Sequence, residues 1–151
     1  VVATSIPRIL LAGAKAASAW LVAILVLIPS VLATAFILGQ ASPSRIAWPL
    51  IAVGLVASAY AGVFAWVSLL TRRAIIVGAV YVLLWEGTIA TFAESADRLS
   101  IAAYGRRIAA AGVDGIDAPD VGLATAVVVL LVVCGLGVGL AARALRRVEL
   151  P

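Results

Sequence analysis

One acidic residue, Glu86, stands inside a long apolar stretch of the chain, and its surroundings suggest chemistry more than those of any other residue. The stretch covers residues 74–93 and carries no other charged side chain. A carboxylate at membrane depth is costly, so it usually faces a polar partner or a water-filled cavity rather than lipid. Two interpretations of Glu86 follow. It takes a direct part in gating or transport, or it hydrogen-bonds to a neighbouring helix and holds a helical bundle together.

A third interpretation makes Glu86 the acid or base of an intramembrane enzyme, but it lacks a second group. General acid–base catalysis usually needs two converging groups, and the sequence places no other carboxylate, no histidine and no serine–lysine pair at membrane depth. Tyr81 lies five residues before Glu86, which in an α-helix is not the same face. We therefore expect no enzyme and no catalytic residue, and Glu86 and Tyr81 are the candidate polar groups of the membrane interior.

Metal and cofactor chemistry also has no sequence signature. The single cysteine, Cys134, lies in an apolar run and the chain has no histidine, so neither an internal disulfide nor a thiolate–imidazole metal site is expected. The sequence contains no G-x-x-x-x-G-K-[ST] phosphate loop. We expect no metal and no cofactor.

The composition indicates an integral membrane protein. Of the 151 residues, 65% are hydrophobic and 12% are charged, and the mean hydropathy is +1.22, whereas a soluble domain is about half apolar and about a quarter charged. The net charge of +4 resides in short basic clusters between apolar stretches, which is typical of topology signals and not of nucleic-acid binding. Abundant glycine and alanine with a single lysine are typical of a GC-rich bacterial genome, so we expect a bacterial plasma (inner) membrane.

Four apolar stretches are long enough to cross a bilayer, because about 20 residues of helix span roughly 30 Å of hydrocarbon. We therefore expect one all-α, polytopic transmembrane domain over residues 1–151, with membrane-spanning helices at residues 16–39, 46–71, 74–93 and 121–142. A stripe of small residues on the second span predicts close approach by another helix; it consists of Ala57, Ser58, Ala61, Gly62 and Ala65. In the last span, Gly135 and Gly139 form a GxxxG pattern, a weaker signal of the same kind.

Residues 94–120 form a polar excursion between the last two expected spans, and Arg98 and Tyr104 are its candidate functional residues. The middle of the segment has an apolar side. We expect one or two short helices that lie on or dip into the membrane surface, followed by a turn at residues 112–115. A connection of this length within a compact bundle is usually functional or disordered.

The basic residues predict the orientation. If the N-terminus is cytoplasmic, seven basic residues lie inside and four outside, as the positive-inside rule requires. The inner residues are Arg8, Lys15, Arg72, Arg73, Arg143, Arg146 and Arg147, and the outer ones are Arg45, Arg98, Arg106 and Arg107. Both chain ends are then cytoplasmic, the 94–120 segment is extracellular, and Glu86 lies in the outer half of its helix.

Several short motifs, taken in order, resemble one family of membrane proteins. They are Ile6-Pro-Arg8 followed by Gly13-Ala-Lys15, then Leu69-Leu-Thr-Arg-Arg73, then Tyr81-Val-Leu-Leu-Trp-Glu86, then Leu99-Ser-Ile followed by Tyr104. This order is similar to that of the C-terminal half of ABC-2-type permeases, the membrane subunits of ATP-binding-cassette exporters. The resemblance covers nearly the whole chain. The family subunit has six transmembrane helices, so the four expected here correspond to its third to sixth, and the chain, which begins without methionine, is expected to be part of a longer protein.

The resemblance implies a mechanism and partners. Two permease subunits, identical or different, face each other among membrane lipids, and each rests on a cytoplasmic ATPase subunit that hydrolyses ATP. Residues 1–15 correspond to a cytoplasmic coupling loop that docks on the ATPase, while Glu86 and residues 94–118 lie near an outer gate. The implied coupling residues are Pro7, Arg8, Ile9, Leu10 and Lys15. An apolar pathway is compatible with a hydrophobic drug, a lipid or a peptide as substrate.

A non-transporting tetraspan subunit, which acts as a scaffold or accessory factor in a larger membrane complex, is the alternative. Its physical requirements are the same: four helices, seams of small residues and one glutamate with a polar partner. The sequence leaves both functions open.

Labelling from outside the cell tests the orientation. In a Cys134→Ala background, we expect a membrane-impermeant thiol reagent to modify the Asp114→Cys variant and to spare Thr71→Cys, whose position lies beside Arg72. The opposite pattern inverts the topology and removes the basis of the transporter assignment.

Overall fold

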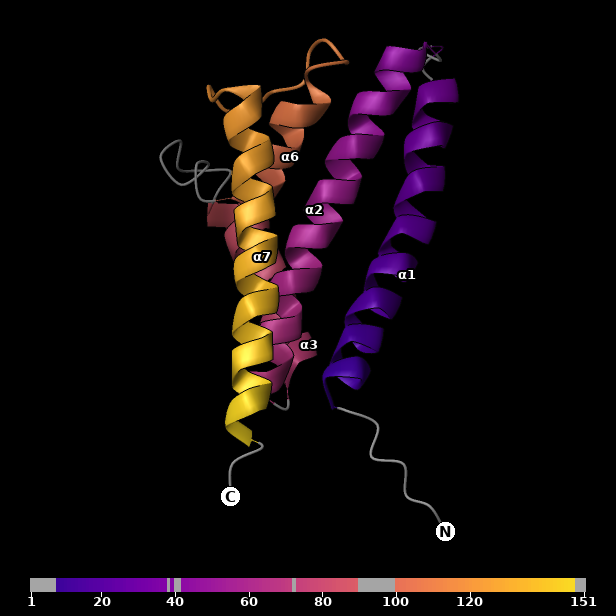
Figure 1. Ribbon diagram of the computed structural model, residues 1–151. Coiled ribbons are helices and arrows are strands. Elements are labelled where there is room, and N and C mark those ends of the chain that lie inside the picture. The colour runs from indigo at the N-terminus through magenta and orange to yellow at the C-terminus, as the bar shows by residue number, and fades with distance from the viewer. Residues whose placement is uncertain (1–7, 38, 40–41, 72, 90–99, 149–151) are drawn as a thin grey trace.

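The computed structural model describes residues 8–37, 39, 42–71, 73–89 and 100–148, and these form a bundle of helices (Figure 1). Within this part of the chain, three helices are long and apolar enough to cross a membrane. They are α1 (Arg8–Ile37), α2 (Pro43–Leu70) and α7 (Leu123–Val148). For the described residues, the prediction of an all-helical fold is confirmed, and three of the four predicted spans have helices that are long and apolar enough to cross a membrane.

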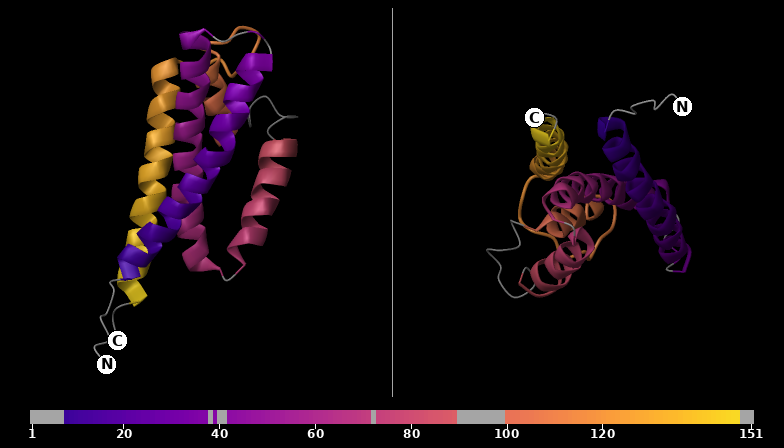
Figure 2. Two further views of the ribbon diagram at one scale, coloured as in Figure 1. Left: turned by 90° about the vertical axis from the view of Figure 1, so that its right-hand side faces the viewer. Right: turned by 90° about the horizontal axis from the view of Figure 1, so that it is seen from below.

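The predicted span at residues 74–93 is the one that is not confirmed. Helix α3 (Ala74–Val80) continues into η1 (Tyr81–Ile89), whose backbone is a π-helix. The apolar portion, Ile76–Trp85, is shorter than a membrane-crossing helix requires, and residues 90–93 lie outside the described residues. Figure 2 (left) shows that α3 and η1 diverge from α2 beyond the turn that joins them.

The start of α1 and the end of α7 lie at the same end of the bundle, at the bottom of Figure 1, and residues 110–122 lie at the top. We call these the terminal end and the loop end. α1 runs toward the loop end, and α2 and α7 both run back from it (Figure 1). This arrangement is compatible with the start of α1 and the end of α7 on one side of a membrane, and the side itself is predicted from the basic residues alone.

α2 and α7 meet backbone to backbone at two glycines. A Cβ added to Gly62 would lie 2.8 Å from the carbonyl oxygen of Cys134, and a Cβ added to Gly137 would collide with the carbonyl carbon of Gly62. The small-residue stripe predicted on the second span therefore does receive another helix. Its partner is Gly137 rather than the GxxxG pair, because a Cβ on Gly135 or Gly139 would meet nothing within 4 Å and helix positions two apart do not share a face.

α1 is joined to α2 by a hydrogen bond within the span. The indole Nε1 of Trp20 donates to Ser58 Oγ at 3.0 Å, and Ser58 Oγ donates to the Gly54 carbonyl at 2.7 Å. Away from this bond α1 is little covered by its neighbours. In its apolar stretch, Trp20–Ile37, 6% of the residues are buried, whereas 22% are buried in α2. α1 is therefore the peripheral helix of the three long ones.

The short helix expected in the polar excursion is α6 (Ile101–Ala109), and it packs between α2 and α7 near the loop end (Figure 1). The buried Ser100 caps it by accepting a hydrogen bond from the Ala103 amide at 3.1 Å. A Cβ on Gly105 would lie 2.5 Å from Val56 Cγ2. The apolar side of α6 is thus covered by two neighbouring helices and contributes to the core of the bundle, and its position relative to the membrane surface stays a prediction. The core residues are Ala52, Ala59, Ile101, Ile108, Ala126 and Leu130.

The contact between Gly62 and Gly137 predicts that substitution by alanine destabilises the protein at these two positions but not at Gly135. We expect Gly62→Ala and Gly137→Ala each to lower the free energy of unfolding by about 1–3 kcal/mol, the usual cost of added carbon atoms in a packed site. Gly135→Ala is the matched control. Its surroundings are open, so the better helix former should leave stability unchanged or raise it by about 0.5–1 kcal/mol. Reversible unfolding in mixed micelles, followed by circular dichroism, measures the difference, and equal destabilisation by all three would contradict the contact.

Candidate functional site

Three arginines hold residues 110–122, the segment that joins α6 to α7, at the loop end. Two of them, Arg106 and Arg107, are neighbours in the last turn of α6. Arg106 Nε donates to the Asp117 carbonyl at 3.2 Å, and Arg107 Nε donates to the Val121 carbonyl at 2.7 Å. Adjacent helix positions point about 100° apart, so the pair reaches two separate points of the segment with charged, and therefore strong, donors.

The third arginine, Arg45, comes from the first turn of α2 and contacts the Asp114 carboxylate at 3.4 Å. The Arg45 side chain is 38% exposed and that of Asp114 is 99% exposed, so water screens this pair and its net contribution is small. The segment turns at Gly115, whose φ of 81° favours glycine. Gly112 packs so closely on α2 that a Cβ would lie 2.5 Å from Trp48 Cδ1. The turn predicted from the sequence is therefore present.

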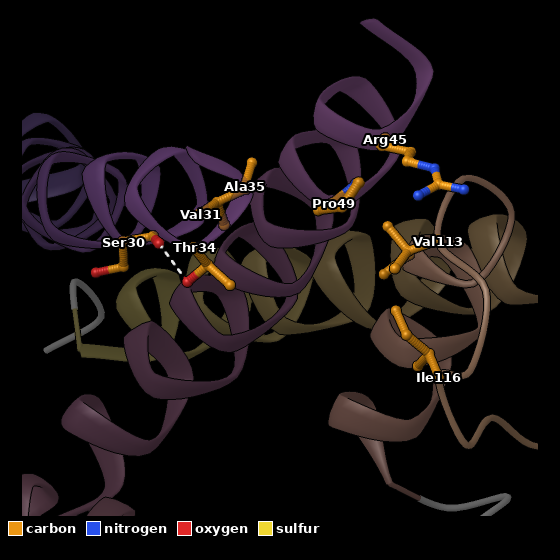
Figure 3. A pocket seen from close by; sticks show the side chains of 9 residues that line it. Ser30, Val31, Thr34, Ala35, Arg45, Pro49, Val113 and Ile116 are labelled. Carbon is orange, nitrogen blue, oxygen red and sulfur yellow. Dashed lines mark hydrogen bonds between the residues drawn. The ribbon is translucent and has the colours of Figure 1, made fainter. Parts of the chain in front are cut away.

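A cleft of about 320 Å³ lies between this segment and α1. Figure 3 shows Val31 and Ala35 on one side, Pro49 between, and Val113 and Ile116 on the other. Its volume is at the lower end of the range of small-molecule sites, about 300–1,000 Å³. The lining residues are Ser30, Val31, Thr34, Ala35, Arg45, Pro49, Ala109, Val113 and Ile116.

The described lining of the cleft contains few polar side chains, and two of them donate hydrogen bonds to backbone carbonyls of their own helix. Ser30 Oγ donates to the Val26 carbonyl at 2.9 Å, and Thr34 Oγ1 donates to the Ser30 carbonyl at 2.8 Å. Arg45 is the one charged residue among those that line the cleft. The cleft therefore offers apolar walls and one cation. It suits a bound apolar or amphiphilic molecule, because its described lining is apolar apart from the Ser30 and Thr34 hydroxyls and the Arg45 guanidinium.

The residues predicted to dock on an ATPase belong to the terminal end. α1 begins at Arg8, so residues 8–15 are helical and continuous with the first span rather than a separate loop. Their coupling role stays a prediction. Outside the described part of the structure lie Pro7 and the side chains of Arg8, Ile9, Leu10 and Lys15.

Tyr81 and Glu86 both belong to η1, and the π-helix changes the relation between their positions. In a π-helix the N–H of residue i+5 bonds to the carbonyl of residue i. Position 86 therefore lies about one turn beyond position 81, whereas a regular α-helix would place them on different faces. π-Segments are rare and are frequent at functional sites. Tyr81 is half-buried, and the Glu86 side chain lies outside the described residues, so its role stays a prediction.

Of the two residues predicted in the polar excursion, the one that the structure describes, Tyr104, is not among the residues that line the cleft. Tyr104 is half-buried on α6 and packs against the core cluster, and Arg98 lies outside the described residues. The residues of the excursion that do line the cleft are Ala109, Val113 and Ile116. Sequence reasoning missed them because isolated apolar residues in a turn carry no chemical signal, and it treated Arg45 only as a topology signal.

Comparison with known proteins adds no relative. No protein-family model, no curated protein and no solved structure matches the chain. The resemblance to ABC-2-type permeases therefore rests on the short motifs alone, and the assignments that depend on it stay predictions.

The arginine contacts predict that one side chain controls the order of the segment. Arg107→Gln removes the 2.7 Å hydrogen bond to the Val121 carbonyl. Because losing a hydrogen bond to a charged group costs about 1.5–3 kcal/mol, we expect amide hydrogen–deuterium exchange in residues 110–122 to accelerate by about tenfold or more. Arg143→Gln, which removes the same charge from an exposed position on α7, is the control and should leave exchange unchanged. Equal exchange in the two variants would mean that other contacts hold the segment.

Proposed function

We propose that the chain is the membrane-embedded subunit of an ATP-driven exporter of the ABC-2 type, with ATP hydrolysis in a separate subunit. The order of short motifs in the sequence is the first support. The structural observation that supports it best is the position of α6 and residues 110–122, which pack at the end of the bundle opposite the start of α1 and the end of α7 (Figure 1). An exporter needs such a separation, because the ATPase engages one end while substrate leaves at the other.

The proposed motion is a tilt of α1 against the other helices. Residues 8–15 continue directly into the first span, so a push on the start of α1 is transmitted along one continuous helix. α1 is the least covered of the three long helices and is linked to α2 by the Trp20–Ser58 hydrogen bond. α2, α6 and α7 pack on one another and move as one unit. A tilt of α1 then changes the width of the cleft at the loop end.

The proposed partners are an ATPase subunit, a second permease subunit, identical or different, and the surrounding lipids of a bacterial plasma membrane. Large apolar side chains are exposed on α1, α2, α3, η1 and α7, among them Leu25 at 74%, Leu83 at 69% and Leu136 at 60%. In a bilayer such surfaces face lipid or another subunit. The exposed apolar surface therefore supports the proposal that a second permease subunit and lipids contact this chain.

A non-transporting scaffold is the second candidate, and one observation favours it. Gly62 and Gly137 bring the backbones of α2 and α7 into contact, so no pathway passes between these two helices. On this alternative the bundle is a structural unit, and Glu86 hydrogen-bonds to a neighbouring helix.

Co-purification distinguishes the two candidates. From membranes of its native host, we expect the tagged chain to bring an ATPase with it, and Arg8→Ala or Lys15→Ala to lower the ATP hydrolysis of the complex without lowering the yield of folded protein. Arg143→Ala, which removes a basic residue of α7 near the terminal end, is the control. A stable complex that lacks any ATPase would contradict the exporter proposal. Glu86→Gln adds a second readout: transport is lost if Glu86 acts in the pathway, and only stability falls if the chain is a scaffold.

A further inference from the structure

We propose that the cleft at the loop end binds an anionic phospholipid, with the phosphate at Arg45 and part of one acyl chain against α1. The inference requires only that the helices lie in a membrane, and so it does not rest on the exporter function.

The walls of the cleft match a hydrocarbon chain. Val31 and Ala35 of α1 face Val113 and Ile116 of the loop-end segment, and Pro49 lies between them (Figure 3). From the first to the last lining residue of α1 the helix rises roughly 8 Å, which accommodates several methylene groups rather than a whole lipid. The remainder of the acyl chain would lie along the exposed surface of α1 beyond Ser30, which carries large uncovered side chains such as Val26 at 60% exposure.

Arg45 supplies the group that recognises the phosphate. A guanidinium has five N–H donors in a planar fork that matches phosphate oxygens. Its contact with Asp114 is 3.4 Å long, whereas a charge-assisted hydrogen bond is about 2.7–2.9 Å. Because the Asp114 side chain is 99% exposed, a phosphate can displace it at little cost. Arg45 also lies in the first turn of α2, where the helix dipole favours negative charge.

The other polar groups of the cleft do not offer a comparable site for a neutral headgroup. The hydroxyls of Ser30 and Thr34 donate to their own helix, and none of the described residues that line the cleft is acidic. Charge complementarity therefore favours an anionic lipid over a zwitterionic one.

The order of groups along the cleft matches the way a lipid lies in a leaflet. α1 runs toward the loop end (Figure 1), so Ser30 and Val31 lie deeper in the bundle than Ala35, and Arg45 lies in the first turn of α2 at the loop end. A phosphate at Arg45 directs the acyl chain toward the middle of the bundle. A partner helix is a poor fit, because a helix with side chains is about 10–12 Å across and the cleft holds about 320 Å³.

Native mass spectrometry of the detergent-solubilised full chain tests the proposal with phosphatidylglycerol and phosphatidylcholine of identical acyl chains. We expect the wild type to bind phosphatidylglycerol about fivefold more tightly, the effect of roughly one favourable cationic contact at the membrane surface. Arg45→Gln should remove this preference. Arg143→Gln, which removes a cation of α7 that is not among the cleft-lining residues, should keep it.

Two further variants test the phosphate contact and the acyl-chain contact separately. Asp114→Asn changes a side chain that is almost fully exposed, and by releasing Arg45 it should increase the preference for phosphatidylglycerol. Ala35→Leu fills part of the cleft and should weaken the binding of both lipids. The proposal is overturned if the wild type shows no preference or prefers phosphatidylcholine, or if Arg45→Gln folds and keeps the preference. It is also overturned if inorganic phosphate displaces the lipid while Ala35→Leu has no effect, since the site then takes a free anion.

Discussion

The contact between the backbones of α2 and α7 at Gly62 and Gly137 is the constraint on which the rest of the bundle depends. Lipid tails are as apolar as leucine side chains, so helices in a membrane gain little from hiding apolar surface, and close packing must supply the attraction. Two glycines permit that approach. α6 then fits against the same pair of helices, with Gly105 on Val56. α1 contributes a hydrogen bond but little buried surface, and so remains at the periphery.

The position of residues 110–122 at the loop end depends on this packing and on hydrogen-bond donors for the carbonyl groups of the segment. A helix supplies hydrogen-bond donors to its own carbonyl groups, whereas the carbonyl groups of an irregular segment need donors from elsewhere. The last turn of α6 supplies them from Arg106 and Arg107. The segment is thereby held over the start of α2, and its apolar residues Val113 and Ile116 come to face α1. The cleft therefore forms because the hydrogen bonds from Arg106 and Arg107 hold the segment in this position.

The proposed transport motion and the proposed lipid site share one helix. α1 forms one wall of the cleft, and its first residues are those proposed to contact an ATPase. A molecule held between α1 and the α2–α6–α7 unit resists any displacement that narrows the cleft. The two proposals stand on separate observations, but both depend on α1 being the long helix with the least burial.

Hydropathy along the chain was sufficient to predict the all-helical class and the positions of three helices long and apolar enough to cross a membrane, because bilayer thickness constrains each such helix independently of its neighbours. It also located the turn at residues 112–115 and the stripe around Gly62, since turn chemistry and small size are local properties. It did not show that Gly137 rather than the Gly135–Gly139 pair meets α2, that α6 is inside the bundle, or that Arg45 and Val113 border the same cleft as Val31. It also assumed a regular helix where η1 is a π-helix. These features depend on how far each helix is rotated about its axis and where it crosses its neighbour. That information arises from contacts between residues distant in the chain, and no single stretch of sequence contains it.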